Sequence, residues 1–381
     1  MKMEAVKKPI YLDHHATTPV DPRVLDAMLP YFTGKFGNAA SRTHSFGWEA
    51  EKAVDRARQQ VAALAGSNPR EILFTSGATE SVNLAIKGTM RPGGHLLVAA
   101  TEHHAVLDTA KHIERGGCAV SLLRTRADGL VSPDEFRAAL RPETQMAAVM
   151  YANNEIGVIQ PIREIGAICR ERGILFFCDA AQAFGKIPVN VETENIDLVA
   201  LSAHKLYGPK GIGALYVRRG VRLDPQIDGG GHESGMRSGT LNVPGIVGFG
   251  EACAICGREM AEEGKRVLEL RERLRAGLEQ DARVNGSLEH RLPGNLNMAF
   301  DGVDAAALLM NLPDIAVSTG SACSSATPQP SHVLRAIGLT DAAARSSVRF
   351  GIGRFNTEEE IDYAAERFSA AARRLRALTP A

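Results

Sequence analysis

Between residues 70 and 218 the chain alternates short apolar segments with helical ones, and this alternation constrains its fold more than any other feature. Runs rich in apolar and β-branched residues predict seven strands, at 71–76, 95–100, 119–123, 146–151, 174–178, 198–202 and 213–217. Several are apolar at almost every position, as strands covered on both faces are. Helical periodicity lies between them, including 79–87, 105–114, 133–140 and 162–172. We therefore predict an α/β domain with a largely parallel sheet wrapped by helices.

The pattern changes after Gly245. A long helical segment extends through Leu278, and a second set of short elements begins at Asn295. At 381 residues the chain exceeds the roughly 100 to 200 residues of an average domain, so a second domain is expected. We place the boundary near residue 260, which predicts a large domain of residues 18–260 and a smaller α+β domain of residues 1–17 and 261–381.

Charge and hydropathy exclude two classes of partner. Lys plus Arg balance Asp plus Glu at 44 each and no long basic run occurs, so the electrostatic footprint of a nucleic-acid-binding protein is missing. The first nine residues lack the apolar core of a signal peptide. No segment approaches the ~20 consecutive apolar residues that cross a membrane. We expect a cytoplasmic protein that acts on a small molecule.

One of the six cysteines differs from the others in its surroundings. Most lie in apolar runs and predict reduced core thiols, and the Cys253/Cys256 spacing favours helix packing over a metal site. Cys323 instead lies in a small-residue run at 318–330 that is too polar and too rich in Gly and Pro to be core. We predict a mobile loop on which Cys323 serves as a nucleophile.

The turn at Ser76-Gly77-Ala78-Thr79 connects a predicted strand to a predicted helix. Backbone N–H groups and the helix dipole converge there beside two hydroxyl groups, which is typical of an anion site. An ordinary helix capped by Ser76 or Thr79, without a ligand, is the alternative.

Three further groups follow predicted strands. Asp179 ends an apolar strand, at the edge where open α/β sheets bind ligands, and could hold a protonated ring nitrogen; a helix cap is the alternative. His103 offers an imidazole for stacking or proton transfer, or belongs to a surface pair with His104. Lys205 lies between an apolar run and a glycine-rich turn, where its amine suits Schiff-base chemistry unless it is only a solvated charge. Together with the anion turn, these groups favour one shared site.

Over nearly its whole length the chain resembles the pyridoxal-phosphate (PLP) dependent cysteine desulfurases of the NifS/IscS type, which are class-V aminotransferase-like enzymes of fold type I. The motifs that carry the resemblance are 11–19, 76–80, 101–103, 153–157, 202–213, 237–240, 320–323 and 346–350. The resemblance implies a large domain with a mostly parallel seven-stranded sheet and a small α+β domain that carries the Cys323 loop.

The resemblance also implies a role for each matching residue. Lys205 would carry PLP as a Schiff base, with His103 stacked over the ring and Asp179 on the pyridine nitrogen. The remaining cofactor contacts would be Ala78, Thr79, Asn154, Gln182 at the ring hydroxyl, Ser202, His204 and, from the second subunit of a homodimer, Thr240. Asn154 and Arg349 match the substrate contacts, and Arg349 would bind the carboxylate of L-cysteine bidentately.

The implied reaction converts L-cysteine to alanine and leaves its sulfur on Cys323 as a persulfide. An acceptor such as an iron–sulfur scaffold protein would receive that sulfur, for cluster assembly or tRNA thiolation. No resident metal is expected, and a transient iron–sulfur ligand role for Cys323 stays open. Two other readings use the same residues: an aminotransferase or selenocysteine lyase, and a non-catalytic sulfur or iron–sulfur scaffold.

Overall fold

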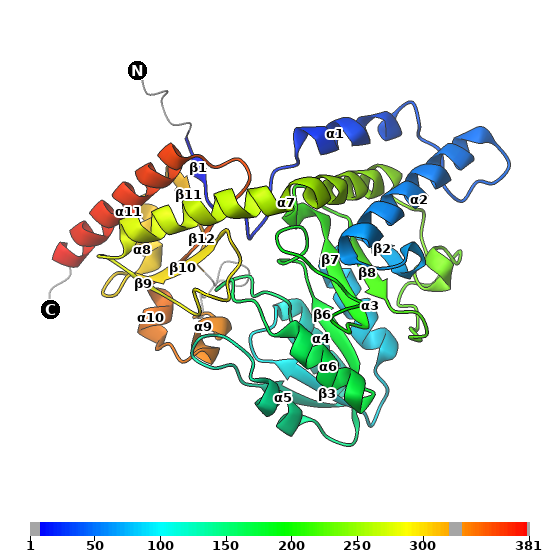
Figure 1. Cartoon of the computed structure of the whole chain (residues 1–381), viewed down its shortest axis with the longest axis horizontal. Coiled ribbons are helices and arrows are strands. Elements are labelled where there is room, and N and C mark those ends of the chain that lie inside the picture. The colour runs from blue at the N-terminus through cyan, green and yellow to red at the C-terminus, as the bar shows by residue number, and fades with distance from the viewer. Residues whose placement is uncertain (1–7, 320–329, 379–381) are drawn as a thin grey trace.

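A seven-stranded sheet forms the centre of the larger part of the molecule (Figure 1). The computed structural model describes residues 8–319 and 330–378. Across the sheet the strands are β2 (Ile72–Thr75), β8 (Gly213–Val217), β7 (Leu198–Ser202), β6 (Leu175–Asp179), β5 (Thr144–Ala148), β3 (His95–Ala99) and β4 (Ala119–Leu123). Neighbours run parallel, except that β8 is antiparallel to β2 and β7. All seven predicted strands are present, although β5 begins at Thr144 rather than Met146.

Helices cover both faces of this sheet, which explains why its strands are apolar at consecutive positions. Along β6, Phe176 packs in one buried cluster and Phe177 in another, because successive side chains point to opposite faces. One face packs against α2 (Ser45–Ala65), α5 (Pro133–Ala139), α6 (Ile162–Arg172) and the first half of α7 (Val243–Leu278). The other face packs against α3 (Ala78–Thr89) and α4 (His104–Arg115). The short helix α1 (Pro22–Met28) and the 3₁₀ turn η1 (Leu29–Phe32) precede α2.

A smaller sheet lies at the other end of α7 (Figure 1). Its antiparallel strands are β12 (Ser347–Gly351), β10 (Asn295–Ala299) and β9 (Arg283–Val284). Nearby, β1 (Ile10–Tyr11) pairs in parallel with β11 (Ile315–Ala316), so the start of the described chain lies against its last third. The helices of this part are α8 (Ala305–Met310), α9 (His332–Ala336), α10 (Asp341–Arg345) and α11 (Glu358–Leu378).

The long helix α7 belongs to both cores. Its buried residues up to Cys256 pack with the large sheet, and those from Val267 onward pack with the small sheet and α11. This change of core along α7 supports the predicted division into 18–260 and 1–17 with 261–381, which stays a prediction. Within the described ranges, no helix is long and apolar enough to cross a membrane.

Candidate active site

A cavity of about 660 Å³ opens at the carboxyl ends of the parallel strands. β3, β5, β6 and β7 run in the same direction, so the segments that follow them meet at one edge of the sheet. Ten of the residues singled out from the sequence line this cavity: Ala78, Thr79, His103, Asn154, Asp179, Gln182, Ser202, His204, Lys205 and Arg349. The strand-end groups therefore share one site.

Lys205 lies in the 3₁₀ turn η3 (Ala203–Lys205) that follows β7, and its amine is held inside the fold. Lys205 Nζ donates hydrogen bonds to the backbone oxygens of His15 and Ala16, each at 2.7 Å. The chain then turns sharply at Tyr207, whose φ of 64° is a left-handed conformation that is uncommon for a bulky residue. These contacts exclude the alternative of a solvated surface charge.

The anion end of the cavity is the N-terminus of α3. Gly77 occupies the N-cap position and no side chain caps the helix, so the alternative of capping by Ser76 or Thr79 is wrong. The first backbone N–H groups of a helix lack partners within it, and here they face the cavity. His204 Nδ1 lies 3.0 Å from Thr17 Oγ1, and burial followed by nearby lysines lowers the pKa of His204 to about 4. A neutral His204 can donate one ring N–H to an anion.

His103 caps helix α4 with its own ring. The backbone N–H of Ala105 donates to His103 Nδ1 at 3.1 Å, so the proton of the neutral ring resides on Nε2. Burial lowers the pKa of His103, which favours that neutral form, although Asp179 opposes the shift. The ring lines the cavity instead of forming a surface pair.

Asp179 ends β6 and is 6% exposed. Its Oδ1 accepts the backbone N–H of Ala181 at 2.9 Å, which is a local turn contact and not a helix cap. Burial raises the pKa of Asp179, while His103 and Lys205 favour the charged form. A protonated ring nitrogen placed against this carboxyl would stabilise the carboxylate further.

Arg349, on β12 of the small sheet, also lines this cavity. Its Nη2 donates to Asp13 Oδ1 at 2.8 Å and its Nη1 to the backbone oxygen of Asn154 at 3.0 Å. The buried Nε has no hydrogen-bond partner within the described residues. The two Nη atoms are thus held by Asn154 and Asp13, while the Nε N–H has no partner in the described part of the chain. A guanidinium in this arrangement can donate to a carboxylate ligand.

Three residues of this region carried no role in the sequence analysis. Asp13 and His15 lie in the 11–19 motif, but their contacts with Arg349 and Gln182 join segments that are far apart in the sequence. Lys186 donates to Gln182 Oε1 at 2.9 Å. In the sequence, only the spacing of four residues between Gln182 and Lys186 could have indicated this contact.

Among the sequence-predicted residues that the structure describes, Thr240 does not line the cavity. Thr240 is exposed and lies after a segment that Arg237 fixes to Glu80 at 2.8 Å. Cys323 lies outside the described residues. The described chain on either side is anchored beside the cavity: Ser318 pairs with Arg349 through backbone hydrogen bonds, and Ser331 Oγ donates to Glu155 Oε2 at 2.5 Å. The other five cysteines are buried, as predicted.

Comparisons with known proteins agree with this architecture. The family model described as Aminotransferase class-V matches residues 10–364. A protein named "Cysteine desulfurase IscS" from Anaeromyxobacter dehalogenans is 58% identical over 98% of this chain and 95% of its own length. One of the same name from Mannheimia succiniciproducens is 56% identical over the same shares. The chain belongs to the class-V aminotransferase family, among the IscS-type cysteine desulfurases.

Solved structures of the family have the same fold. A structure described as "NIFS-LIKE PROTEIN" superposes with a TM-score of 0.90 at 37% identity, covering 96% of this chain and 99% of that one. Another, "SspA in complex with cysteine", superposes with a TM-score of 0.80 at 36% identity, covering 92% and 100%. The fold predicted from the sequence, a PLP-dependent transferase fold of type I, is therefore confirmed.

Cysteine desulfurases and other class-V aminotransferases depend on PLP in general. The residues of this cavity fit that cofactor. An uncapped helix N-terminus, a serine and a neutral histidine suit its phosphate, the buried Asp179 suits its ring nitrogen, and Lys205 offers an amine between them. A Cβ on Gly77 would meet no atom within 4 Å, so the wall at this point is open to a ligand.

Proposed function

We propose that this cysteine desulfurase binds PLP in the 660 Å³ cavity and transfers the sulfur of L-cysteine to Cys323. The observation that carries the proposal is the convergence of Lys205, Asp179 and Arg349 on one cavity whose far end is the N-terminus of α3. The first two suit the cofactor, and Arg349 suits the carboxylate of an amino acid.

Each end of the cofactor would have its own set of contacts. The phosphate would take the N–H groups of Ala78 and Thr79 with the side chains of Ser202 and His204. The ring would lie between His103 and the strand end, with its nitrogen on Asp179. Its hydroxyl would face Gln182 and Asn154. When bound, PLP supplies an electron-withdrawing ring that acidifies the Cα–H bond of an amino acid joined to it.

Lys205 and His103 would move protons at the substrate. Lys205 would hold the cofactor through its Nζ, and the same amine, when free, would serve as a base at the substrate Cα. His103 carries its ring proton on Nε2, because Nδ1 accepts from Ala105, so Nε2 can donate a proton within the cavity. Arg349 orients the substrate by its carboxylate, which leaves the sulfur free to point away from it.

The Cys323 thiol completes the reaction. The C–S bond of L-cysteine breaks, an S–S bond forms on Cys323, and the thiol's proton balances the new C–H bond of alanine. No external oxidant or reductant is needed. Ser318 and Ser331 begin and end the segment that carries Cys323, and both are bonded to residues of this site or next to it. A sulfur-acceptor protein would then receive the persulfide sulfur.

We also propose that the active form is a homodimer. Thr240, which would complete the phosphate contacts of a second subunit, is exposed. Residues from the segments 39–42 and 230–236, together with Leu241, line a common groove. Aromatic side chains are exposed on the segment from η1 into α2: Phe32, Phe36, Phe46 and Trp48. Such apolar surface is typical of a subunit contact.

Turnover with L-cysteine tests the proposal. The protein is expected to bind PLP with a visible absorption band, to form alanine and, with a reductant, to release sulfide. Mass spectrometry should find one added sulfur on Cys323. Cys323→Ala should lose sulfide release, whereas Cys118→Ala, a buried thiol far from the site in sequence, should keep it. Keto-acid-dependent amino transfer without sulfide would favour an aminotransferase instead.

A further inference from the structure

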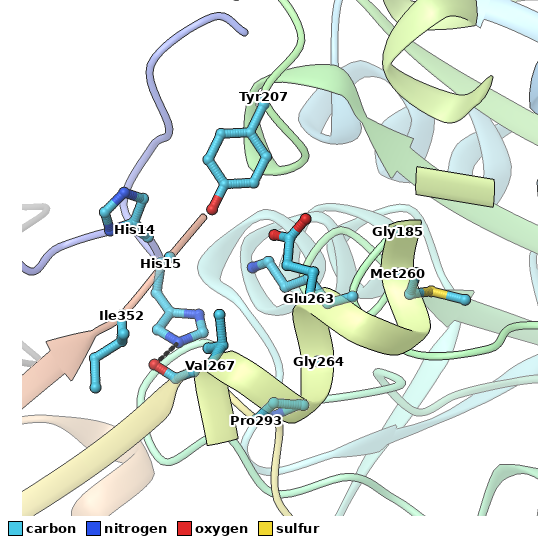
Figure 2. A pocket seen from close by; sticks show the side chains of 13 residues that line it. His14, His15, Gly185, Tyr207, Met260, Glu263, Gly264, Val267, Pro293 and Ile352 are labelled. Atoms are coloured by element: carbon cyan, nitrogen blue, oxygen red, sulfur yellow. Dashed lines mark hydrogen bonds between the residues drawn. The ribbon is translucent and has the colours of Figure 1, made fainter. Parts of the chain in front are cut away.

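A second, much smaller cavity lies beside His15 (Figure 2). Its volume is about 30 Å³, which is room for about one water molecule. Figure 2 shows His14, His15, Tyr207 and Glu263 around it, with Glu263 on α7. Lys186 also lines this cavity, and none of the roles described above uses it.

Lys186 is linked to Lys205 through the side-chain amide of Gln182 and the backbone oxygen of His15. Lys186 Nζ donates to Gln182 Oε1 at 2.9 Å. At the other end of the amide, Gln182 Nε2 donates to the backbone oxygen of His15 at 2.8 Å. That oxygen also accepts from Lys205 Nζ at 2.7 Å. The NH₂ end of the amide therefore lies next to the reactive lysine, and the oxygen end lies next to Lys186.

The orientation of this amide depends on what each end meets. Rotation by 180° would place the NH₂ group against the Lys186 ammonium and the oxygen against the His15 carbonyl, two repulsive contacts. His15 Nδ1 lies 2.9 Å from Gln182 Oε1, but its other ring nitrogen lies 3.3 Å from the oxygen of Gly294. A neutral imidazole has one proton for these two acceptors, so the ring of His15 alone does not fix the amide.

We propose that Lys186 is a positioning residue that fixes the Gln182 amide with its NH₂ group toward Lys205 and the cofactor ring. The inference rests on the proposed function, because it assigns to that NH₂ group a cofactor oxygen as its partner. With the amide fixed, the donor is in place before the cofactor enters and no reorientation opposes binding.

The charge of Lys186 makes this contact depend on pH. An ammonium group can only donate, whereas a neutral amine can also accept from an amide NH₂. Burial, followed by the charges of Lys205 and Arg349, lowers the pKa of Lys186 to about 7. The titratable and charged groups around it come from four parts of the chain: His14 and His15, Lys205 and Tyr207, Cys256 and Glu263 on α7, and Arg349 on β12. The fixing of the amide is thus strongest below pH 7 and weakens as Lys186 loses its proton.

A double-mutant cycle on PLP affinity tests the inference. The apoprotein is titrated with PLP, and binding is followed by absorbance and by quenching of protein fluorescence. Lys186→Met is expected to weaken PLP binding about fivefold to tenfold, the equivalent of one hydrogen bond. Lys186→Arg should restore much of it. In a Gln182→Leu background, Lys186→Met should cause no further loss. Lys265→Met, which removes an exposed lysine of α7, is the matched control.

The pH dependence of PLP affinity distinguishes a positioning role of Lys186 from a purely structural one. The ratio of the parent's PLP affinity to that of Lys186→Met should be largest near pH 6 and shrink toward pH 9. Equal losses in both Gln182 backgrounds, or no loss in either, would overturn the inference. If Lys186→Met lowers the melting temperature too far to be titrated, Lys186→Leu replaces it in the cycle. A parent protein that binds no PLP overturns the proposed function as well, so the two failures are distinguishable.

Discussion

Replacing Arg349 tests the substrate end of the site most directly. In Arg349→Gln the guanidinium disappears while a shorter hydrogen-bonding side chain remains. A bidentate guanidinium–carboxylate contact contains two charge-assisted hydrogen bonds, each with a net contribution of about 1.5 kcal/mol at the low end of its range. Their loss, about 3 kcal/mol, lowers kcat/KM for L-cysteine roughly 100-fold.

The structure also predicts how this loss divides between binding and turnover. The carboxylate contact is made in the ground state and the transition state alike, so KM should rise more than kcat falls. Arg349→Lys keeps the charge but loses the bidentate geometry, and about a tenfold loss is expected. Asp13→Asn is the informative counterpart. It removes the charge that holds Arg349 Nη2 at 2.8 Å, which frees the guanidinium for the substrate and should lower KM.

Alanine formation measured over a range of L-cysteine concentrations gives both parameters. The absorption band of bound PLP and the melting temperature serve as controls, because Arg349 also forms an ion pair with Asp13 in which both side chains are largely buried. A variant that keeps the band and the parent's KM, and loses only kcat, would refute the assignment of Arg349 to the substrate carboxylate.

Three further predictions concern stability. Phe176 is fully buried on β6, so Phe176→Ala should lower the free energy of unfolding by about 3 to 5 kcal/mol in denaturant titration. The same variant should retain PLP less well, since β6 positions the ring-nitrogen contact. A loss below about 1 kcal/mol would contradict this packing. Burial raises the pKa of Glu155 from 4.5 to about 7. Between these two pH values the native state keeps a proton that the unfolded chain has lost. The contribution of Glu155 to the free energy of unfolding therefore falls as pH rises from 4.5 to 7. The stability difference between the parent and Glu155→Gln should show that slope, and a flat difference would contradict it. Glu233→Ala leaves Arg58 and a backbone N–H of β2 without their buried partner and should cost about 3 kcal/mol by thermal or chemical unfolding, with Glu192→Ala as an exposed control.

The sequence predicted the strand-end part of the site because parallel strands place their carboxyl ends at one edge. Asp179, His103 and Lys205 each follow a strand, so the strand pattern alone was enough to bring them together. Asp13 and Lys186 could not be found this way. Asp13 reaches the site because β1 pairs with β11 and Gly351 of β12 lies beside it, which are contacts between the two ends of the chain.

The local backbone conformation decided whether the N-terminus of α3 is capped by a side chain. The hydroxyls at Ser76 and Thr79 predicted a possible helix cap, but Gly77 takes the cap position in an extended, positive-φ conformation and leaves the first N–H groups of α3 uncapped. Only the folded backbone distinguishes a capped helix from an anion site, because both use the same residue types.

By itself, then, the sequence determined the α/β architecture and the order of strands and helices, because periodicity is a local property of the chain. The strand ends indicated a shared site, and the resemblance to a known family implied which residues would serve a PLP-dependent reaction there. The tertiary structure decided the protonation and orientation of those residues. The pKa values of His103, Asp179 and His204, and the contact of Lys186 with Gln182, depend on burial and on neighbours that are distant in sequence or on the other side of a turn. Desolvation and hydrogen-bond direction are properties of the packed interior, and no spacing of residues along the chain specifies them.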